Sequence, residues 1–363
     1  MKASRFLLIM LSLLVGTASC AAAESEAADG KMSFLPLPAM FSTPETGFGG
    51  GAILMAIGNL YPDRSEQLQD SYRLAGIYTV KRQSSFALQA EHYIPGNGLK
   101  LDADASFSRY PSTFYGIGGP WGGTEEDYTQ EACLADATLG FAIAPALYLG
   151  PRVRWTRYSM QDRESGGFLD RGEIEGSGGA NVLLLGPVLS YEGRDSPMAP
   201  TRGCFVELVS AYSPKSLGGS SSFSSSSIDL RAYAKPFADF GAVAAVKLYA
   251  AMAQGEVPFQ ELPKMGGDGM LRGYLEAKYQ DKAVAIAQAE LRLPVFWRFG
   301  LAVFGGVGFI GSDALDLSLD DPRFAGGLGF RFLVDKNSGT NLRMDLAWGE
   351  SQPQLYFELG EAF

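Results

Sequence analysis

The chain has 363 residues, 46% of them hydrophobic, and a formal net charge of −10 at pH 7. An acidic chain whose lysines and arginines do not cluster is a poor candidate for binding nucleic acid, so no nucleic-acid partner is expected. Its three cysteines stand in separate segments and are too few for a disulfide-rich scaffold.

The first residues have the pattern of a secretory signal peptide. Lys2 and Arg5 carry positive charge, and an apolar run follows from Phe6 to Val15. This run is too short to cross a bilayer as a helix. We therefore expect residues 1–23 to direct export and then to be removed.

Two processing patterns fit the residues after that run. Ala21 and Ala23 form the A-x-A pattern of ordinary cleavage after Ala23. In the alternative, a lipoprotein signal, Cys20 becomes the acylated first residue. Thr17 occupies the position where such a signal carries a large aliphatic residue, so ordinary cleavage is favoured.

Beyond residue 45 the sequence alternates between apolar and polar residues, in segments separated by Gly, Pro, Ser, Asp and Asn. The segment 100–109 is the clearest example. One face of the strand would carry Leu101, Ala103, Ala105 and Phe107. The other face would carry Asp102, Asp104, Ser106 and Ser108. Alternation at period two predicts β-strands with one apolar and one polar face.

Three features favour a transmembrane barrel over a water-soluble sandwich, which also alternates. The strands are about ten residues long, rather than about five or six. The polar face is rich in small and charged residues, as a water-filled lumen requires. Aromatic residues stand near the segment ends, where interfacial girdles belong, namely Tyr72, Tyr93, Tyr110, Tyr158, Tyr212 and Trp348.

Fifteen strands are well defined, near residues 48–60, 71–80, 86–93, 100–109, 128–141, 146–159, 179–190, 203–212, 224–235, 241–252, 283–293, 299–310, 323–332, 341–348 and 354–363. Outer-membrane barrels close with even numbers of strands, so a sixteenth is expected in the weak segment 32–41, whose prolines suit an edge-like or irregular strand. The polar stretch 213–227 is expected to be a solvated outer loop.

The predicted fold class is all-β, a transmembrane antiparallel β-barrel of 16 strands. Residues 44–363 would form the barrel domain. Residues 24–43 would form a short N-terminal segment that includes the weak first strand.

The chain ends in a segment of strict period two. Leu355, Phe357 and Leu359 share one face, and the last residue is Phe363. This pattern predicts a last strand over 354–363 and looks like the C-terminal signal by which outer-membrane barrels are recognised for assembly. The alternative is a last strand that simply ends there.

The sequence offers no catalytic or metal-binding constellation. Its single histidine, His92, stands at the end of a strand, and no serine lies in a G-x-S-x-G context. Metal-ligand residues do not cluster at ligand spacing, and the acidic stretch 312–324 is expected to be a solvated loop. We therefore expect no enzyme activity, no catalytic residue, no metal and no cofactor.

The glycine-rich stretch KMGGDGMLRGYLEAKYQ, residues 264–280, resembles a phosphate-binding loop only superficially. The spacing of Gly267, Gly269 and Gly273 misses the dinucleotide pattern, and no Gly-Lys-Ser/Thr is present. No amphipathic helix follows it either. Nucleotide binding is therefore not expected.

Within that stretch, MLRGY at Met270–Tyr274 resembles the (V/I/L)-R-G-(F/Y) signature of the Omp85 superfamily, also called the bacterial surface antigen D15 or BamA/TamA family. Three further segments are similar to that family: SYEGRDSPMAPTRG at 190–203, AELRLPV at 289–295 and PETGFGGG at 44–51. The resemblance extends over residues 44–363.

The resemblance implies that a long extracellular loop folds back into the barrel lumen and sets an arginine against the inner wall. This lumen-loop motif comprises Leu271, Arg272, Gly273 and Tyr274. Glu290 is implied as the partner of Arg272. The family's F-x-D-x-G motif is present with Gly306 in place of its aspartate, so one of the two usual carboxylate partners is expected to be missing.

The resemblance also implies a function at the bacterial outer membrane. The distance from Ala23 to Gly47 is too short for the periplasmic POTRA domains of the large members, so the chain resembles the short, POTRA-less type. We expect an Omp85-type barrel that assists insertion or translocation of proteins or lipids. The alternative is a passive pore or a structural surface antigen. Expected partners are the outer-membrane lipid bilayer, the barrel-assembly machinery during biogenesis and a separate periplasmic protein.

Overall fold

The computed structural model describes residues 32–58, 70–94, 98–120, 125–196, 199–236, 240–313, 316–317, 321–334, 339–350 and 352–363. The predicted signal peptide, its cleavage site and Cys20 lie outside these residues. No helix in this part of the chain is long and apolar enough to cross a membrane.

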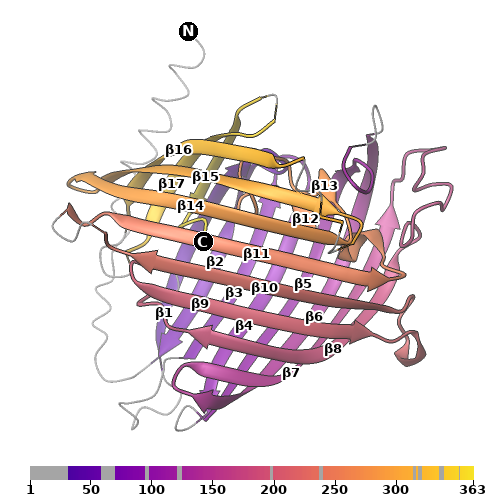
Figure 1. The fold of residues 1–363 in the computed structure, drawn as a ribbon, viewed down its shortest axis with the longest axis horizontal. Coiled ribbons are helices and arrows are strands. Elements are labelled where there is room, and N and C mark those ends of the chain that lie inside the picture. The colour runs from indigo at the N-terminus through magenta and orange to yellow at the C-terminus, as the bar shows by residue number, and fades with distance from the viewer. Residues whose placement is uncertain are drawn as a thin grey trace.

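Sixteen antiparallel strands close into one barrel, and the last strand returns to the first (Figure 1). The barrel strands are β1 (Ser33–Thr43), β2 (Gly47–Gly58), β3 (Asp70–Thr79), β4 (Ser84–Ile94), β5 (Leu99–Phe114), β6 (Glu126–Ala144), β7 (Leu147–Gln161), β8 (Ala180–Glu192), β9 (Gly203–Ser213), β10 (Phe223–Ala234), β11 (Val243–Gly255), β14 (Ala283–Phe296), β15 (Phe299–Gly311), β16 (Arg323–Leu333), β17 (Asn341–Trp348) and β18 (Gln354–Leu359). A separate two-stranded sheet, β12 (Lys264–Met265) with β13 (Tyr279–Gln280), lies between β11 and β14 in the chain. The all-β class and the sixteen-stranded barrel are confirmed, and the weak segment forms β1, upstream of residue 44.

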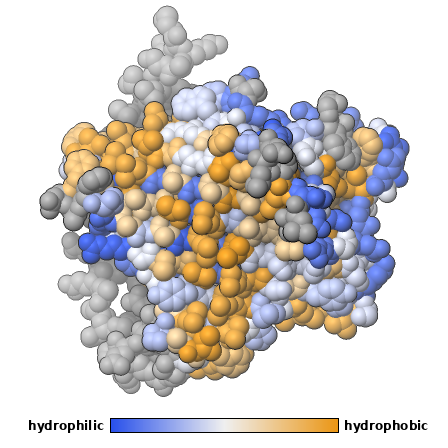
Figure 2. All heavy atoms as spheres, viewed as in Figure 1, coloured by the Kyte–Doolittle hydropathy of each residue, from blue (hydrophilic) through white to orange (hydrophobic). Residues whose placement is uncertain are grey.

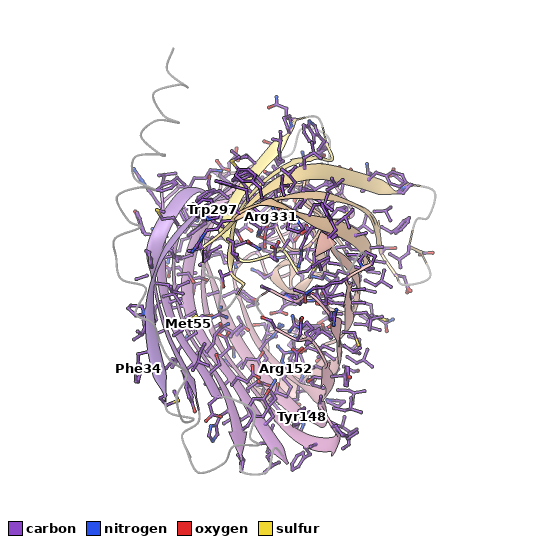
Figure 3. The ribbon with its side chains drawn as sticks, turned by 90° about the vertical axis from the view of Figure 1, so that its left-hand side faces the viewer. Phe34, Met55, Tyr148, Arg152, Trp297 and Arg331 are labelled. Atoms are coloured by element: carbon purple, nitrogen blue, oxygen red, sulfur yellow. The ribbon has the colours of Figure 1, made fainter. Side chains whose placement is uncertain are left out.

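Alternate residues of the strands face opposite sides of the barrel wall. On β15, Leu301 and Val303 are about half exposed, whereas Ala302 between them is buried. Hydrophobic side chains gather over the outer face of the strands, and hydrophilic ones gather at the end that carries the long loops (Figure 2). Figure 3 shows Phe34 on the outside of the wall and Arg152 inside it. The period-two pattern therefore separates a lipid-facing surface from a polar interior.

Position near a strand end does not by itself place an aromatic residue in a girdle. Tyr212 and Trp348 are about half exposed on the outer face, as a girdle requires. Tyr93 is buried inside the barrel, and Tyr158 donates a hydrogen bond to the carboxylate of Glu261 (2.8 Å). The parity of a residue within its strand decides which face it occupies. The girdle prediction is therefore wrong for these two tyrosines.

The last strand is shorter than the sequence predicts. It ends at Leu359, and Gly360 turns the chain with a φ of +96°. Phe363 is consequently buried inside the barrel, where it packs with Tyr233 and Ala245. A last strand that runs to Phe363 is wrong, because the glycine leaves the extended conformation. The assembly-signal role of this segment stays a prediction.

The serine-rich stretch decides between two overlapping predictions, a strand near 224–235 and a solvated loop over 213–227. β10 begins at Phe223, so the strand prediction is right for Ser224–Ser227 and the loop prediction is wrong there. Each of these serines has a register partner on β9 and on β11. Serine composition suggested a loop, but pairing on both sides supplies the backbone hydrogen bonds that a strand needs. Ser225 and Ser227 consequently face the lumen.

The long-loop end of the barrel is closed by a small hydrophobic core. We call its loop residues the cap: Leu169, Ile174, Val257, Phe259 and Leu262. They pack on inward residues of the wall, and the ring of Phe259 lies 5.4 Å from that of Phe114 in an edge-on arrangement. Apolar burial therefore holds two separate loops over the mouth of the barrel.

The closure between β1 and β18 is the most weakly paired junction. Its register comprises one pair, Ser42 with Phe357. On its other side β1 pairs with β2 without interruption, from Ser33 to Thr43. Pro36 and Pro38 lie in the part of β1 that has no partner on β18, and proline has no N–H to donate. We refer to this junction as the seam.

We expect amide hydrogens of β1 and β18 to exchange faster than those of β10 and β11. Opening at the seam breaks few backbone hydrogen bonds, whereas β10 and β11 are paired along their full lengths. Hydrogen–deuterium exchange of the detergent-solubilised barrel, followed by mass spectrometry of its peptides, measures this difference. Equal protection of the two regions would contradict a weak seam.

Candidate functional site

The connection between β11 and β14, residues 256–282, crosses the interior of the barrel, and we call it the lumen loop. Its Gly273 N–H donates to the hydroxyl of Tyr356 on β18 (3.1 Å). The side-chain amide of Gln280 donates to the carbonyl of Gly116, just beyond β5 (3.2 Å). These contacts lie on different parts of the wall, so the loop spans the lumen between them.

Arg272 is the most deeply buried charge of this loop, with 2% of its surface exposed. Its Nη2 lies 2.5 Å from Oε2 of Glu290 on β14, and its Nη1 pairs with Asp345 on β17. The guanidinium carbon lies 3.6 Å from the ring centroid of Phe304. Two carboxylates and an aromatic face therefore replace the water that a buried guanidinium loses.

The second carboxylate corrects the expectation that Arg272 keeps one partner. Gly306 does stand where an aspartate was expected, but a Cβ there would lie 2.9 Å from Cδ1 of Leu271 and 2.7 Å from the carbonyl oxygen of Ala287. The glycine therefore leaves room for the loop. The alternation of β17 marks Asp345 as an inward acid, but nothing in the sequence pairs it with Arg272.

Three more arginines extend the site into a charge network. Arg331 Nη1 donates to Asp345 Oδ1 (2.5 Å), and its Nη2 donates to Glu290 Oε1 (3.2 Å). Arg292 Nε donates to the same Glu290 oxygen (2.8 Å), and Arg343 Nη1 donates to Asp345 Oδ2 (3.0 Å). Arg331 points into the barrel in Figure 3. Each of the two carboxylates is thus shared by three guanidinium groups.

The network also holds the end of the chain and a turn at the opposite end of the barrel from the cap. Arg292 donates to the backbone carbonyl of Phe363 (2.8 Å) and to that of Pro200 (3.3 Å). Arg331 donates to Glu361 through its Nε (2.9 Å). Phe357 and Leu359, which the sequence groups with Phe363, lie instead in β18 itself.

The turn around Pro200 contains the segment GRDSPMAPTRG. Asp195 accepts hydrogen bonds from the backbone N–H of Thr201 (2.8 Å) and of Arg202 (3.2 Å). Partial burial acts to raise the pKa of Asp195, but the hydrogen bonds from Thr201 and Arg202 outweigh it and hold the pKa below its usual value. This carboxylate therefore stabilises the turn above its unfolded-state pKa and loses that effect as the pH falls.

The other members of the loop motif fix the backbone around Arg272. Gly273 has a φ of +109°, and a Cβ on it would lie 2.8 Å from the carbonyl carbon of Trp348. Leu271 is buried and has a φ of +92°, which a leucine rarely adopts. Tyr274 donates from its hydroxyl to the carbonyl of Phe324 (3.1 Å). Close packing on both sides therefore sets the direction of the arginine.

The single histidine lies against an acid and a tyrosine on neighbouring parts of the wall. His92 Nδ1 lies 3.1 Å from Asp70 Oδ1 and 3.1 Å from the hydroxyl of Tyr72. No group of three or more His, Cys, Asp or Glu in this part of the chain is arranged to hold a metal ion. Cys133 and Cys204 are free thiols.

Comparison with known proteins places this geometry in a family. Residues 71–363 match the family model described as the Omp85 superfamily domain. The chain is similar to the solved structure of BamA from Haemophilus ducreyi lacking POTRA domains 1–3, with a TM-score of 0.61 and 14% identity over 91% of this chain and 70% of that chain.

Two further solved structures are similar in fold. CdiB from Acinetobacter baumannii has a TM-score of 0.57 and 14% identity, over 91% of this chain and 60% of that chain. CdiB from Escherichia coli has a TM-score of 0.56 and 14% identity, over 90% of this chain and 62% of that chain. The chain therefore spans less than two thirds of either CdiB. None of the curated proteins matches it in sequence.

We expect Asp345→Asn and Glu290→Gln each to destabilise the barrel by up to about 3–5 kcal/mol, the cost of breaking a buried ion pair. Each change removes a charge that three arginines share. The measurement is the temperature at which the folded band converts to the unfolded band on a gel. Glu173→Gln, in an exposed pair with Arg171, is the control and should leave that temperature unchanged. An unchanged Asp345→Asn would exclude that carboxylate as an anchor.

We also expect Gly306→Ala to destabilise the barrel by about 1–3 kcal/mol, the usual cost of overpacking. The added methyl group would collide with Leu271 and with the backbone of β14. Gly305→Ala is the matched control, because a Cβ on that outward residue meets only the carbonyl oxygen of Ala325, at 3.4 Å. The same gel assay compares the two, and equal behaviour would show that the space at Gly306 is not needed by the loop.

Proposed function

This chain belongs to the Omp85 superfamily, and on that premise we propose that it assists the insertion or translocation of proteins at the bacterial outer membrane. The family assignment and the barrel fold, shared with BamA and CdiB, support this role. The proposed role is not enzymatic. Insertion or translocation requires the controlled exposure of a sheet edge and neither makes nor breaks a covalent bond. The same proposal extends to lipids as the molecules that are inserted or translocated.

The observation that carries the proposal is the seam. With one register pair to β18, most of the β1 edge is available to another extended chain once the two strands part. An exposed strand edge templates the addition of a further strand through backbone hydrogen bonds. The weak closure between the first and last strands of this chain is such a junction.

Passage through the lumen is less favourable than passage at the seam. The cap closes the long-loop end, and the lumen loop is tied across the interior by Arg272. Both would have to leave buried positions to open a wide pore. These contacts disfavour the alternative of a passive pore. They leave the alternative of a structural surface antigen to the experiment below.

Two partners belong to the proposal besides the lipid bilayer. The barrel-assembly machinery is expected to insert this chain during biogenesis. A separate periplasmic protein is expected to deliver clients, and co-purification of the complex from solubilised membranes would identify it.

We expect depletion of the protein to change the protein or lipid content of the outer membrane, and a locked seam to reproduce that change. Ser42→Cys with Phe357→Cys, in a chain whose native cysteines are replaced by alanine, places two thiols on directly paired residues. Quantitative proteomics and lipid analysis of outer membranes, with the disulfide oxidised or reduced, give the measurement.

The control lock joins a junction that is paired throughout. Ile228→Cys with Ala250→Cys forms the same kind of bridge between β10 and β11. It should leave the outer membrane unchanged in both redox states. An unaltered outer membrane after depletion would support a structural antigen instead. If depletion changes the outer membrane but the oxidised seam disulfide does not, the function does not require opening of the seam.

A further inference from the structure

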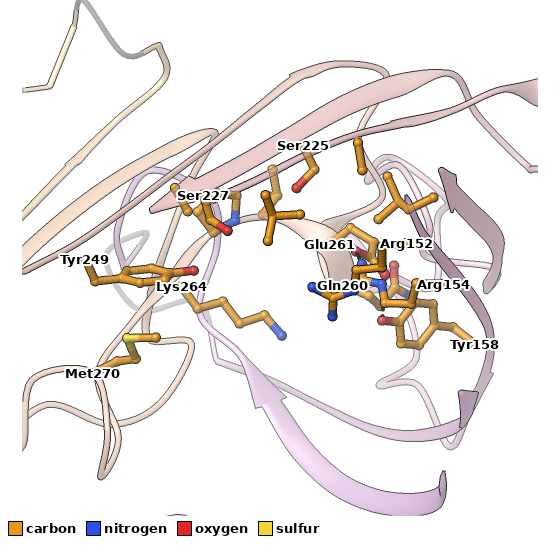
Figure 4. A pocket seen from close by; sticks show the side chains of 16 residues that line it. Arg152, Arg154, Tyr158, Ser225, Ser227, Tyr249, Gln260, Glu261, Lys264 and Met270 are labelled. Carbon is orange, nitrogen blue, oxygen red and sulfur yellow. Dashed lines mark hydrogen bonds and ion pairs between the residues drawn. The ribbon is translucent and has the colours of Figure 1, made fainter. Parts of the chain in front are cut away.

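A cavity of about 330 Å³ lies inside the barrel on the side of β7 to β11. Inward residues of these strands form its walls, and residues 260–264 and Met270 of the lumen loop close it. It adjoins the cap, with which it shares Leu262. Figure 4 shows Arg152 and Arg154 on the β7 side and the side chain of Lys264 extending inward from the loop.

The lining of this cavity has more positive than negative charge. Arg152 is bidentate with Asp136, with N–O distances of 2.6 and 2.9 Å, and Arg154 pairs with Glu261. Glu261 is the one acidic residue among those that line the cavity. The ammonium of Lys264 has no ion pair or hydrogen bond with any described residue. One positive charge of the lining therefore has no direct ion pair, and a further acid, Glu207 of β9, interacts electrostatically with Arg152.

Several polar atoms that line the cavity have no hydrogen-bond partner, and among them the buried Oε1 of Gln260 is an acceptor. The Nε of Arg154 is buried without a hydrogen-bond partner. The hydroxyls of Ser225 and Ser227, on β10, line the cavity and make no hydrogen bond with the described chain. These donors and Lys264 come from three different walls. Donors on three sides suit an oxyanion with oxygens in several directions better than a flat carboxylate.

The wall around the cavity excludes a lipid as the source of this anion. β7 and β8 are paired from Leu147 to Tyr158, and β10 is in register with β9 and with β11 over nearly its whole length. β8 is in register with β9 at Leu185 and again from Val188 to Glu192, and beyond β9 the N–H of Ser220 donates to the carbonyl of Asn181 (2.7 Å). An acyl chain has no opening through a hydrogen-bonded wall, and the seam lies on the other side of the barrel. The occupant must therefore be soluble and enter through the lumen.

We propose that this cavity binds a small soluble phosphate-type anion, either inorganic phosphate or a phosphate monoester. Lys264 supplies a positive charge that has no ion pair, Arg154 Nε supplies a directed donor, and Ser225 and Ser227 complete the contacts. The volume lies at the small end of ligand pockets, which suits an anion with few heavy atoms. The site is separate from the seam and does not depend on the proposed insertion function.

The test is isothermal titration calorimetry of the folded full barrel in detergent, with three separate probes: inorganic phosphate, glycerol 3-phosphate and a short-chain phosphatidic acid. The two soluble probes should bind and the lipid should not. Lys264→Gln should weaken binding about 10- to 100-fold, as expected for loss of a charge-assisted hydrogen bond. Ser227→Ala should weaken it by up to about tenfold.

Lys215→Gln is the matched control, because Lys215 is an exposed lysine in the loop before β10 and is outside the cavity. It should leave the affinity unchanged. Heat-dependent gel mobility verifies that each variant is folded. The proposal is overturned if no soluble probe binds, if Lys264→Gln and Ser227→Ala both bind as the unmodified chain does, or if phosphatidic acid alone binds.

Discussion

A guanidinium held between two carboxylates is the interaction on which the interior of this barrel depends. Arg272 is almost completely buried, and a charge at that depth is tolerated only when carboxylates and hydrogen bonds replace its water. Glu290 and Asp345 provide this from β14 and β17. Because Arg272 stands within a loop whose ends belong to β11 and β14, fixing the arginine fixes the loop across the lumen.

The lumen loop is held on the far side by chemistry of the same kind. Glu261, near the start of the loop, pairs with Arg154 of β7 and accepts a hydrogen bond from Tyr158. The two attachments lie on different parts of the wall, and the apolar cap closes the space above one of them. The interior is thereby divided into a dense charge network near the seam and a more open, donor-rich cavity beside β7 to β11. Neither the charge network nor the cavity leaves an unobstructed path along the barrel axis. We therefore assign the proposed activity to the seam and not to the lumen.

The sequence predicts the class of this fold well because strand alternation is a local property. Residue parity alone places Leu301 outside and Ala302 inside. The motif likewise indicates Arg272 and Glu290. It does not indicate Asp345, because a partner on β17 becomes visible only when distant strands are brought together. The sequence also does not predict the inward turn of Phe363. The period-two alternation continues to the last residue, but the left-handed conformation of Gly360 ends the strand before it. The serines of β10 show that pairing on both sides can override a composition typical of loops.

The second acid of the tether stands at position 345 and not at position 306, and this determines what the tether is connected to. At position 306 a side chain would occupy the space of Leu271, so the loop packs closely there only against a glycine. At position 345 the carboxylate is shared among Arg272, Arg331 and Arg343, and it therefore joins the loop to β16 and β17. β17 pairs directly with β18, whose Tyr356 bonds to the loop at Gly273. A displacement of the strands beside the seam must consequently act on the groups that hold Arg272, so that the weakest junction of the wall and the strongest contact of the lumen are mechanically linked.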